Sequence, residues 1–109
     1  MESNKPVELT GEKLESMIEE NSVVVVDFYA DWCAPCKQME PIMESVAEEV
    51  GDKAVIGKVN VDDEREAATS YQVSSIPAIL FFKDGELEER TVGAKAKETL
   101  KEKIDELAD

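Results

Sequence analysis

The chain has 109 residues, of which 42% are apolar and 35% charged; this fits one globular domain over residues 1–109 and excludes disorder throughout. Its formal net charge of −14 argues against binding to nucleic acids or to anionic membrane surfaces, because both reward Lys and Arg. No run approaches the roughly 18 apolar residues of a membrane span, and the start lacks the basic-then-apolar order of a secretory signal, so we expect a cytoplasmic protein.

The first half of the sequence predicts two strands that alternate with two helices. Residues 6–9 can form a short strand, and apolar residues three and four apart predict a helix over residues 11–20. Residues 23–30 begin with four consecutive valines, which is typical of a strand covered on both faces, as in a parallel sheet. Residues 34–50 again place apolar side chains at spacings of three and four, so we predict an amphipathic helix that Pro41 kinks.

The second half of the sequence predicts the remainder of an α/β fold. Residues 54–61 form a strand that completes a strand–helix–strand unit with parallel strands, and residues 64–71 form a short helix. Residues 78–82 and 87–92 flank an Asp-Gly pair, which is a strong signal for a β-hairpin. Residues 95–107 carry apolar side chains at helical spacing. The predicted architecture is a mixed sheet with helices on both faces.

The feature of the sequence that carries chemistry is its one pair of cysteines, Cys33 and Cys36. The pair lies just after a buried strand, where a helix begins, and open α/β sheets build their sites at this edge. Residues three apart at a helix start share one face, so the two sulfurs can come within bonding distance. The positive helix end favours a thiolate at Cys33, which makes Cys33 the attacking nucleophile and Cys36 the resolving thiol of a disulfide exchange.

Three other interpretations of the cysteine pair compete with this one. Half of a zinc site would need further Cys or His ligands, and the chain has two cysteines and no histidine. A structural disulfide that closes so short a loop would remove little entropy from the unfolded chain. Two unreactive core cysteines are harder to reconcile with Trp32 before the pair and with Pro35 inside it, at a place where proline suits the first turn of a helix.

The absence of histidine leaves a carboxylate, a thiolate or water as the proton acceptor. Asp27 is the candidate, because it interrupts the apolar strand over residues 23–30. A buried carboxylate without a partner has a raised pKa and could take the proton of Cys36 near neutral pH. The alternative is that Asp27 points to solvent at the strand end, and periodicity does not decide between the two.

The segment from Val26 to Lys37, with the sequence VDFYADWCAPCK, closely resembles the active-site segment of the thioredoxin family. A Cys-x-x-Cys pair alone would be a weak motif, whereas the resemblance covers nearly the whole chain in order and is highly specific. Beyond that segment it extends to Pro41, Lys58-Val59-Asn60-Val61-Asp62, Ser75-Ile76-Pro77, Lys83-Asp84-Gly85 and Val92-Gly93-Ala94.

The resemblance implies a central mixed sheet of about five strands flanked by about four helices. It also implies a monomeric reductase of protein disulfides with no bound cofactor beyond the redox-active disulfide Cys33–Cys36. A thioredoxin reductase would re-reduce this disulfide with electrons from NADPH or ferredoxin. Asp27 matches the buried acid of the family and Lys58 matches that acid's neighbour, which supports the role of Asp27 as proton acceptor.

Pro77 matches a cis proline that the family places beside the cysteines. A proline there presents no N–H to the thiols and leaves the backbone of Ile76 free to pair with an extended substrate segment. The alternative is that Ile76, Gly93 and Ala94 serve only core and turn packing. The resemblance implies an apolar docking surface formed by Trp32, Ala34, Pro35, Ile76, Pro77, Gly93 and Ala94.

Three residues depart from the commonest pattern of the family: Ala34 replaces Gly, Tyr29 replaces Trp and Ala78 replaces Thr. These changes concern redox potential and partner choice more than fold or reaction. A disulfide oxidase or isomerase would use the same site, but such members usually carry His where this chain has Pro35, which favours a reductase. A non-catalytic binding module, or a metal or iron–sulfur cluster bridged between two chains, would be a different class of function.

Overall fold

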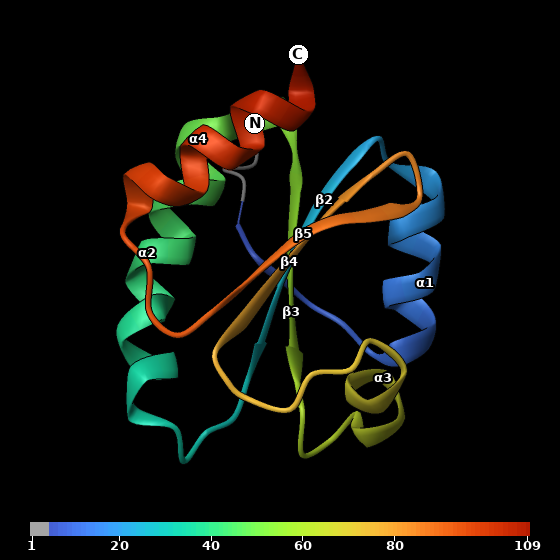
Figure 1. The fold of residues 1–109 in the computed structure, drawn as a ribbon, viewed down its shortest axis with the longest axis vertical. Coiled ribbons are helices and arrows are strands. Elements are labelled where there is room, and N and C mark those ends of the chain that lie inside the picture. The colour runs from blue at the N-terminus through green and yellow to red at the C-terminus, as the bar shows by residue number, and fades with distance from the viewer. Residues whose placement is uncertain (1–4) are drawn as a thin grey trace.

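A computed structural model describes residues 5–109 and contains a five-stranded sheet with helices on both sides (Figure 1). No helix within this range is long and apolar enough to cross a membrane. The strands are β1 (Val7–Glu8), β2 (Val23–Tyr29), β3 (Val55–Asn60), β4 (Ala78–Lys83) and β5 (Glu86–Val92). The helices are α1 (Gly11–Glu20), α2 (Ala34–Val50), α3 (Arg65–Ser70) and α4 (Lys97–Ala108), with a 3-10 turn at Gly51–Lys53.

The strand order β1-β3-β2-β4-β5 gives a mixed sheet. β1, β3 and β2 run parallel, whereas β4 is antiparallel to β2, and β5 is antiparallel to β4. The mixed sheet with helices on both faces is therefore confirmed. This order places β2 in the centre of the sheet, so the chain leaves a strand covered on both faces just before it reaches the cysteines.

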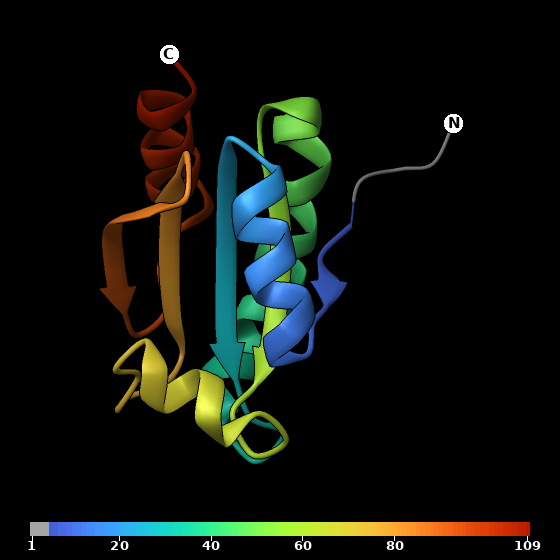
Figure 2. The same ribbon diagram turned by 90° about the vertical axis from the view of Figure 1, so that its right-hand side faces the viewer.

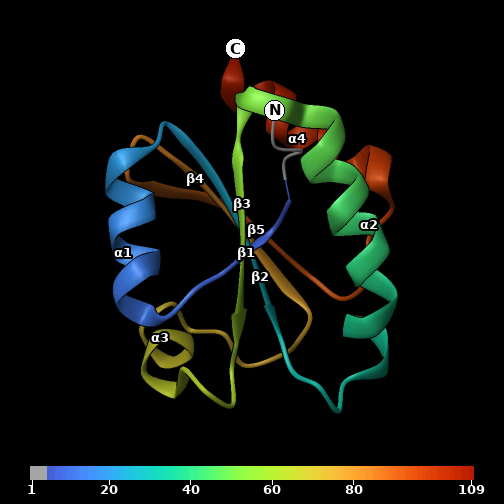
Figure 3. The ribbon, with the colours of Figure 1, turned by 180° about the vertical axis from the view of Figure 1, so that it is seen from behind.

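Two helical layers explain why the valine run is continuous rather than alternating. α2 and α4 cover one face of the sheet and α1 and α3 cover the other (Figures 2 and 3). Val23 and Val25 belong to the apolar core under α2 and α4, whereas Val24 and Val26 belong to the core on the other face. Successive side chains of a strand point to opposite faces, so a strand between two layers needs apolar residues at every position. Asp27 breaks that rule and points toward the face that α2 covers.

The element boundaries differ from the sequence expectation mainly at α4. The expected helix over residues 95–107 begins at Lys97, because Gly93 has a φ of +89° and Ala96 is still extended. The Lys95 N–H instead donates to the sulfur of Met39, at 3.4 Å. Pro41 lies inside α2 as expected, and the kink there stays a prediction. The hairpin between β4 and β5 is confirmed, with both turn residues at positive φ.

Candidate active site

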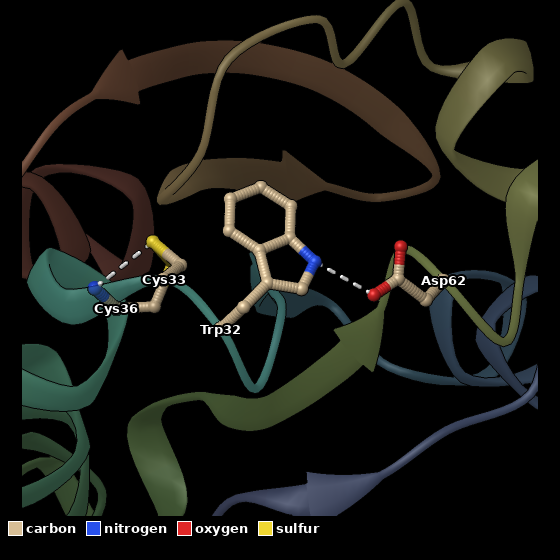
Figure 4. Close-up of a disulfide and its surroundings, with 4 residues drawn as sticks. All are labelled: Trp32, Cys33, Cys36 and Asp62. Atoms are coloured by element: carbon tan, nitrogen blue, oxygen red, sulfur yellow. Dashed lines mark hydrogen bonds between the residues drawn. A yellow bond between two sulfur atoms is a disulfide. The ribbon is translucent and has the colours of Figure 1, made fainter.

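Cys33 and Cys36 form a disulfide at the point where α2 begins, with their Cα atoms 5.2 Å apart. Cys33 is the N-cap of the helix, and its Sγ accepts a hydrogen bond from the Cys36 N–H at 3.2 Å (Figure 4). Pro35 occupies the first turn, where a missing N–H costs nothing. A cysteine takes the N-cap place that Ser or Asp often fills, so its sulfur lies among the unpaired N–H groups of the helix end.

This geometry makes the two sulfurs chemically unequal. The N–H that reaches Cys33 Sγ and the positive end of the α2 dipole both favour negative charge on that sulfur. Cys36 lies one turn into the helix and packs with Cys33 and Ala30 in a small apolar cluster. Cys36 receives no comparable hydrogen bond from residues 5–109. The site therefore favours a thiolate on the first cysteine.

Trp32 projects from the loop before the helix and is 71% exposed. Its indole Nε1–H donates to the carboxylate of Asp62 at 2.9 Å (Figure 4). Asp62 is itself positioned by a turn in which its N–H donates to Oδ1 of Asn60, also at 2.9 Å. Sequence reasoning gave Asp62 no role, because its contact with Trp32 joins segments 30 residues apart.

Asp27 is buried, with 4% of its surface exposed, so the alternative that it points to solvent is wrong. Its Oδ1 has no hydrogen-bond partner among the described residues. Burial raises the pKa of Asp27 from 3.8 to about 7, against the opposing effect of Lys58 and with further increases from Glu40 and Glu8. A pocket of about 390 Å³ is lined by Asp27, Cys36, Glu40 and Lys58 among others. The carboxyl group therefore shares one cavity with the second cysteine.

Lys58 is the register partner of Asp27 on β3 and lines the same pocket. Its ammonium lies 3.9 Å from the carboxylate of Glu8 and 5.6 Å from the ring centroid of Tyr29. The Tyr29 hydroxyl donates to the same Glu8 carboxylate at 2.7 Å. Sequence reasoning missed Glu8, although its position in the first strand would have placed it beside Lys58 if the order of the strands had been known.

The residues expected to form the docking surface come from three segments at this end of the sheet: the loop and first turn of α2 after β2, the loop before β4 and the loop after β5. The peptide bond between Ile76 and Pro77 is cis, and the Pro77 carbonyl accepts a hydrogen bond from the Gly93 N–H at 2.8 Å. Ile76 is half-buried and packs against the cysteine cluster, whereas Pro77 is buried. Trp32, Ala34, Pro35 and Ala94 are exposed, and Gly93 is partly exposed.

Residues 5–109 contain no group of three or more His, Cys, Asp or Glu side chains arranged to hold a metal ion. The half-site interpretation of the cysteine pair finds no further ligands in this range. The groups that the structure does bring together at this site are the Cys33–Cys36 disulfide and the buried carboxyl group of Asp27.

Comparisons with known proteins agree with this geometry. A model of the thioredoxin family matches residues 5–106. The thioredoxin of Bacillus subtilis is 49% identical over 82 residues, which are 75% of this chain and 79% of that protein. The M-type chloroplast thioredoxin of Spinacia oleracea is 42% identical over 91 residues, 84% of this chain and 50% of that protein. A mutant thioredoxin from Halobacterium salinarum superposes with a TM-score of 0.92 at 36% identity, covering 100% of this chain and 96% of that one.

Proposed function

We propose that this chain, which belongs to the thioredoxin family of protein-disulfide oxidoreductases, works as a reductase of target-protein disulfides. Its redox-active group is the Cys33–Cys36 disulfide, and the family carries no bound cofactor. The observation that carries the assignment of roles is the hydrogen bond from the Cys36 N–H to Cys33 Sγ at the start of α2. It singles out Cys33 as the sulfur that is stabilised as a thiolate.

The reaction proceeds by two thiol–disulfide exchanges. The Cys33 thiolate attacks one sulfur of the target disulfide, a Cys33–target bond forms, and the other target sulfur leaves as a thiolate. The Cys36 thiol then gives its proton to Asp27, and the Cys36 thiolate attacks Cys33 Sγ. This step closes the Cys33–Cys36 disulfide and releases the second target sulfur. Two electrons pass from the dithiol to the target.

The proton-acceptor role of Asp27 is supported by where it lies and by how it titrates. It lines the same pocket as Cys36, and its pKa of about 7 lets it accept a proton at neutral pH and release it again. Lys58 lies beside it and favours the carboxylate form. Both residues act on the second exchange, in which Cys36 must lose its proton.

The proposed docking surface surrounds the dithiol, whose two cysteines are themselves largely buried. Trp32 and Pro35 present apolar surface on one side of the cysteines, and Ile76 packs against them on another. The backbone of Ile76 would pair with an extended segment of the target, while the cis proline after it offers no N–H to the sulfurs. Ala34, Pro77, Gly93 and Ala94 complete this surface.

The partners and location follow from the same proposal. Residues 1–109 act as one monomeric domain in the cytoplasm, and a thioredoxin reductase returns electrons from NADPH or ferredoxin to the Cys33–Cys36 disulfide. The relatives support the use of a reductase because they are thioredoxins by name. The strongly acidic chain supports protein targets rather than nucleic acids or anionic membranes.

The assignment of the two cysteines is tested by trapping the mixed disulfide. The reduced Cys36→Ser protein should form a stable covalent adduct with a disulfide-containing target such as insulin, because the attacking thiol is present and the resolving thiol is gone. The reduced Cys33→Ser protein should form little adduct. Both variants should lose catalytic turnover, which is measured as insulin reduction with dithiothreitol.

The same pair of variants separates a reductase from a binding module. A module that works only by binding would keep its function in the Cys33→Ser protein. Equal adduct yields from the two variants would contradict the assignment of Cys33 as the attacking sulfur. Adducts are counted by mass spectrometry under non-reducing conditions.

A further inference from the structure

Three charged residues form a row across the sheet on the face that α2 covers. Glu8 on β1 and Asp27 on β2 are both register partners of Lys58 on β3, the strand between them. Register partners in parallel strands point to the same face of the sheet. One ammonium group therefore lies between two carboxyl groups, one of them at the exposed edge of the sheet and the other buried beside the dithiol.

Tyr29 contacts both the ammonium group and the exposed carboxylate of this row. Tyr29 lies two residues after Asp27 on β2 and so shares its face. Its hydroxyl donates to Glu8 at 2.7 Å, and its ring lies under the Lys58 ammonium, 5.6 Å from ring centroid to nitrogen. Burial and the hydrogen bond to Glu8 raise the pKa of the Tyr29 hydroxyl above its ordinary value, so this donor keeps its proton throughout the neutral range.

The contacts of Lys58 are thus uneven. It forms an ion pair with Glu8 at 3.9 Å, and the described residues contain no such pair between Lys58 and Asp27. Asp27 is left with one oxygen that has no hydrogen-bond partner in the same range. We propose that Glu8, held in place by Tyr29, is a positioning residue that draws the Lys58 ammonium away from Asp27 and so sets how much of that positive charge Asp27 experiences.

Other charged groups also surround Asp27, and their positions do not depend on Glu8 or Tyr29. α2 contributes Cys36, Glu40, Glu44 and Glu48 to the pocket, and Lys5 lines it from the segment before β1. β4 contributes only the apolar Ile79 opposite Asp27. Of the carboxylates, Glu40 and Glu8 raise the pKa of Asp27, whereas Lys58 lowers it. Glu8 is the one of these carboxylates that also binds Lys58, so it acts on Asp27 both by its own charge and by placing the cation.

The positioning role of Glu8 is tested by titrating Asp27 directly. Carbon-13 NMR of the Asp27 carboxyl carbon in the oxidised protein gives its titration midpoint. Glu8→Gln should lower this midpoint by a few tenths of a pH unit or more, because the repelling charge is lost and Lys58 is free to approach Asp27. Tyr29→Phe keeps every formal charge at neutral pH and the aromatic ring. It should lower the midpoint by a smaller amount, since Glu8 is no longer held against Lys58.

Glu88→Gln is the matched control, because it makes the same change of charge on β5, at the opposite edge of the sheet. It should leave the Asp27 midpoint unchanged. The Glu8→Gln shift should shrink in about 1 M salt, because the side chains of Lys58 and Glu8 are 37% and 52% exposed and their charges are screened. An unchanged midpoint in Glu8→Gln overturns the inference. An unchanged midpoint in Tyr29→Phe also overturns it, since Glu8 would then act by its charge alone.

The positioning role of Glu8 rests on the proposed function only in its effect on the rate of the second exchange. If Asp27 accepts the Cys36 proton, the pH profile of the second exchange should move to lower pH in Glu8→Gln together with the NMR midpoint. This rate is measured as the release of a target from the Cys33 mixed disulfide over pH 5–9. A midpoint that moves while the pH profile of the rate does not would contradict the proton-acceptor role of Asp27 and leave the positioning role of Glu8 standing.

Discussion

At the scale of single residues, Asp27 differs from the other buried polar residues of the described chain. The other two are Asn60 and Thr91, which are uncharged and avoid the cost of a buried ion. Asp27 is ionisable, and burial raises its pKa to about 7. A buried Asp27 lowers the stability of the fold at neutral pH, yet it lines the same cavity as Cys36. This combination indicates a residue that serves the reaction rather than stability.

Asp27→Asn should remove a pH-dependent loss of stability. The unfolded chain loses the Asp27 proton near pH 3.8 and the folded chain near pH 7, so the folded state binds more protons between these values. The stabilisation by the bound proton is complete below about pH 3.8 and is lost as the pH rises through 7. A rise of the Asp27 pKa from 3.8 to about 7 corresponds to a loss of about 4 kcal/mol in the free energy of unfolding once the pH lies above both values.

The test compares urea unfolding of the oxidised wild-type and Asp27→Asn proteins from pH 4 to pH 8. The variant should gain stability relative to the wild type as the pH rises, by up to about 4 kcal/mol at pH 8. The other carboxyl groups are common to both proteins, so they cancel in the difference. A difference that does not change with pH would mean that Asp27 titrates normally in the folded protein.

At the scale of elements, α4 is fixed to the rest of the fold by contacts at both ends. Near its start, Lys97 and Lys101 each bind Glu49 of α2 at 2.7 Å. At its end, the Lys83 ammonium of β4 donates to the carbonyl of Leu107 at 2.6 Å. The last carbonyls of a helix lack partners within the helix, and a cation there also complements the helix dipole. Lys83 therefore stabilises the last turn of α4.

Lys83→Met should destabilise the protein by about 1 kcal/mol, because it keeps the aliphatic stem and removes the donor to Leu107. Hydrogen exchange should speed up in the last turn of α4. Lys53→Met is the matched control, because Lys53 lies in the 3-10 turn after α2 and also contacts α4. It removes the ion pair with Asp105, whose two side chains are 58% and 50% exposed, and should cost less than about 0.5 kcal/mol. If urea unfolding showed that Lys83→Met and Lys53→Met lose the same free energy of unfolding, this would contradict a capping role for Lys83.

At the scale of the whole molecule, the excess of 26 acidic over 12 basic residues dominates the electrostatics. The chain folds to a radius of gyration of 12.5 Å over its Cα atoms, so like charges are brought within about one or two Debye lengths of each other at physiological salt. Such self-repulsion opposes the compact state. It also disfavours association with acidic partners.

Raising the salt concentration from about 10 mM to about 200 mM should raise the melting temperature by a few degrees, because screening weakens this repulsion. The double variant Glu86→Lys/Glu88→Lys makes the net charge less negative through two exposed residues of β5. It should melt higher than the wild type at low salt and respond less to added salt. Calorimetry on both proteins checks this. A melting temperature independent of salt in the wild type would show that the repulsion has no net effect on stability.

The local pattern of the sequence was enough to predict most elements and the reactive pair. α2 begins and ends where its apolar spacing predicted, and the valine run forms the central strand between two helical layers. The cysteine pair lies at the start of α2 with the first sulfur as the helix cap. These features depend on periods of two and 3.6 residues and on helix-end chemistry, all of which act over a few residues of the chain.

Only the tertiary structure decided which side chains surround the pair. The family resemblance already implied a buried Asp27 next to Lys58, whereas the contact from Trp32 to Asp62 and the contacts of Lys58 with Glu8 and Tyr29 join segments that no motif connects. They depend on the strand order β1-β3-β2-β4-β5, which places β3 between the first two strands in sequence. The spacing of residues along the chain does not predict that β1 lies beside β3. The sequence therefore determined the reacting atoms, and the packing of the sheet decided the charges that tune them.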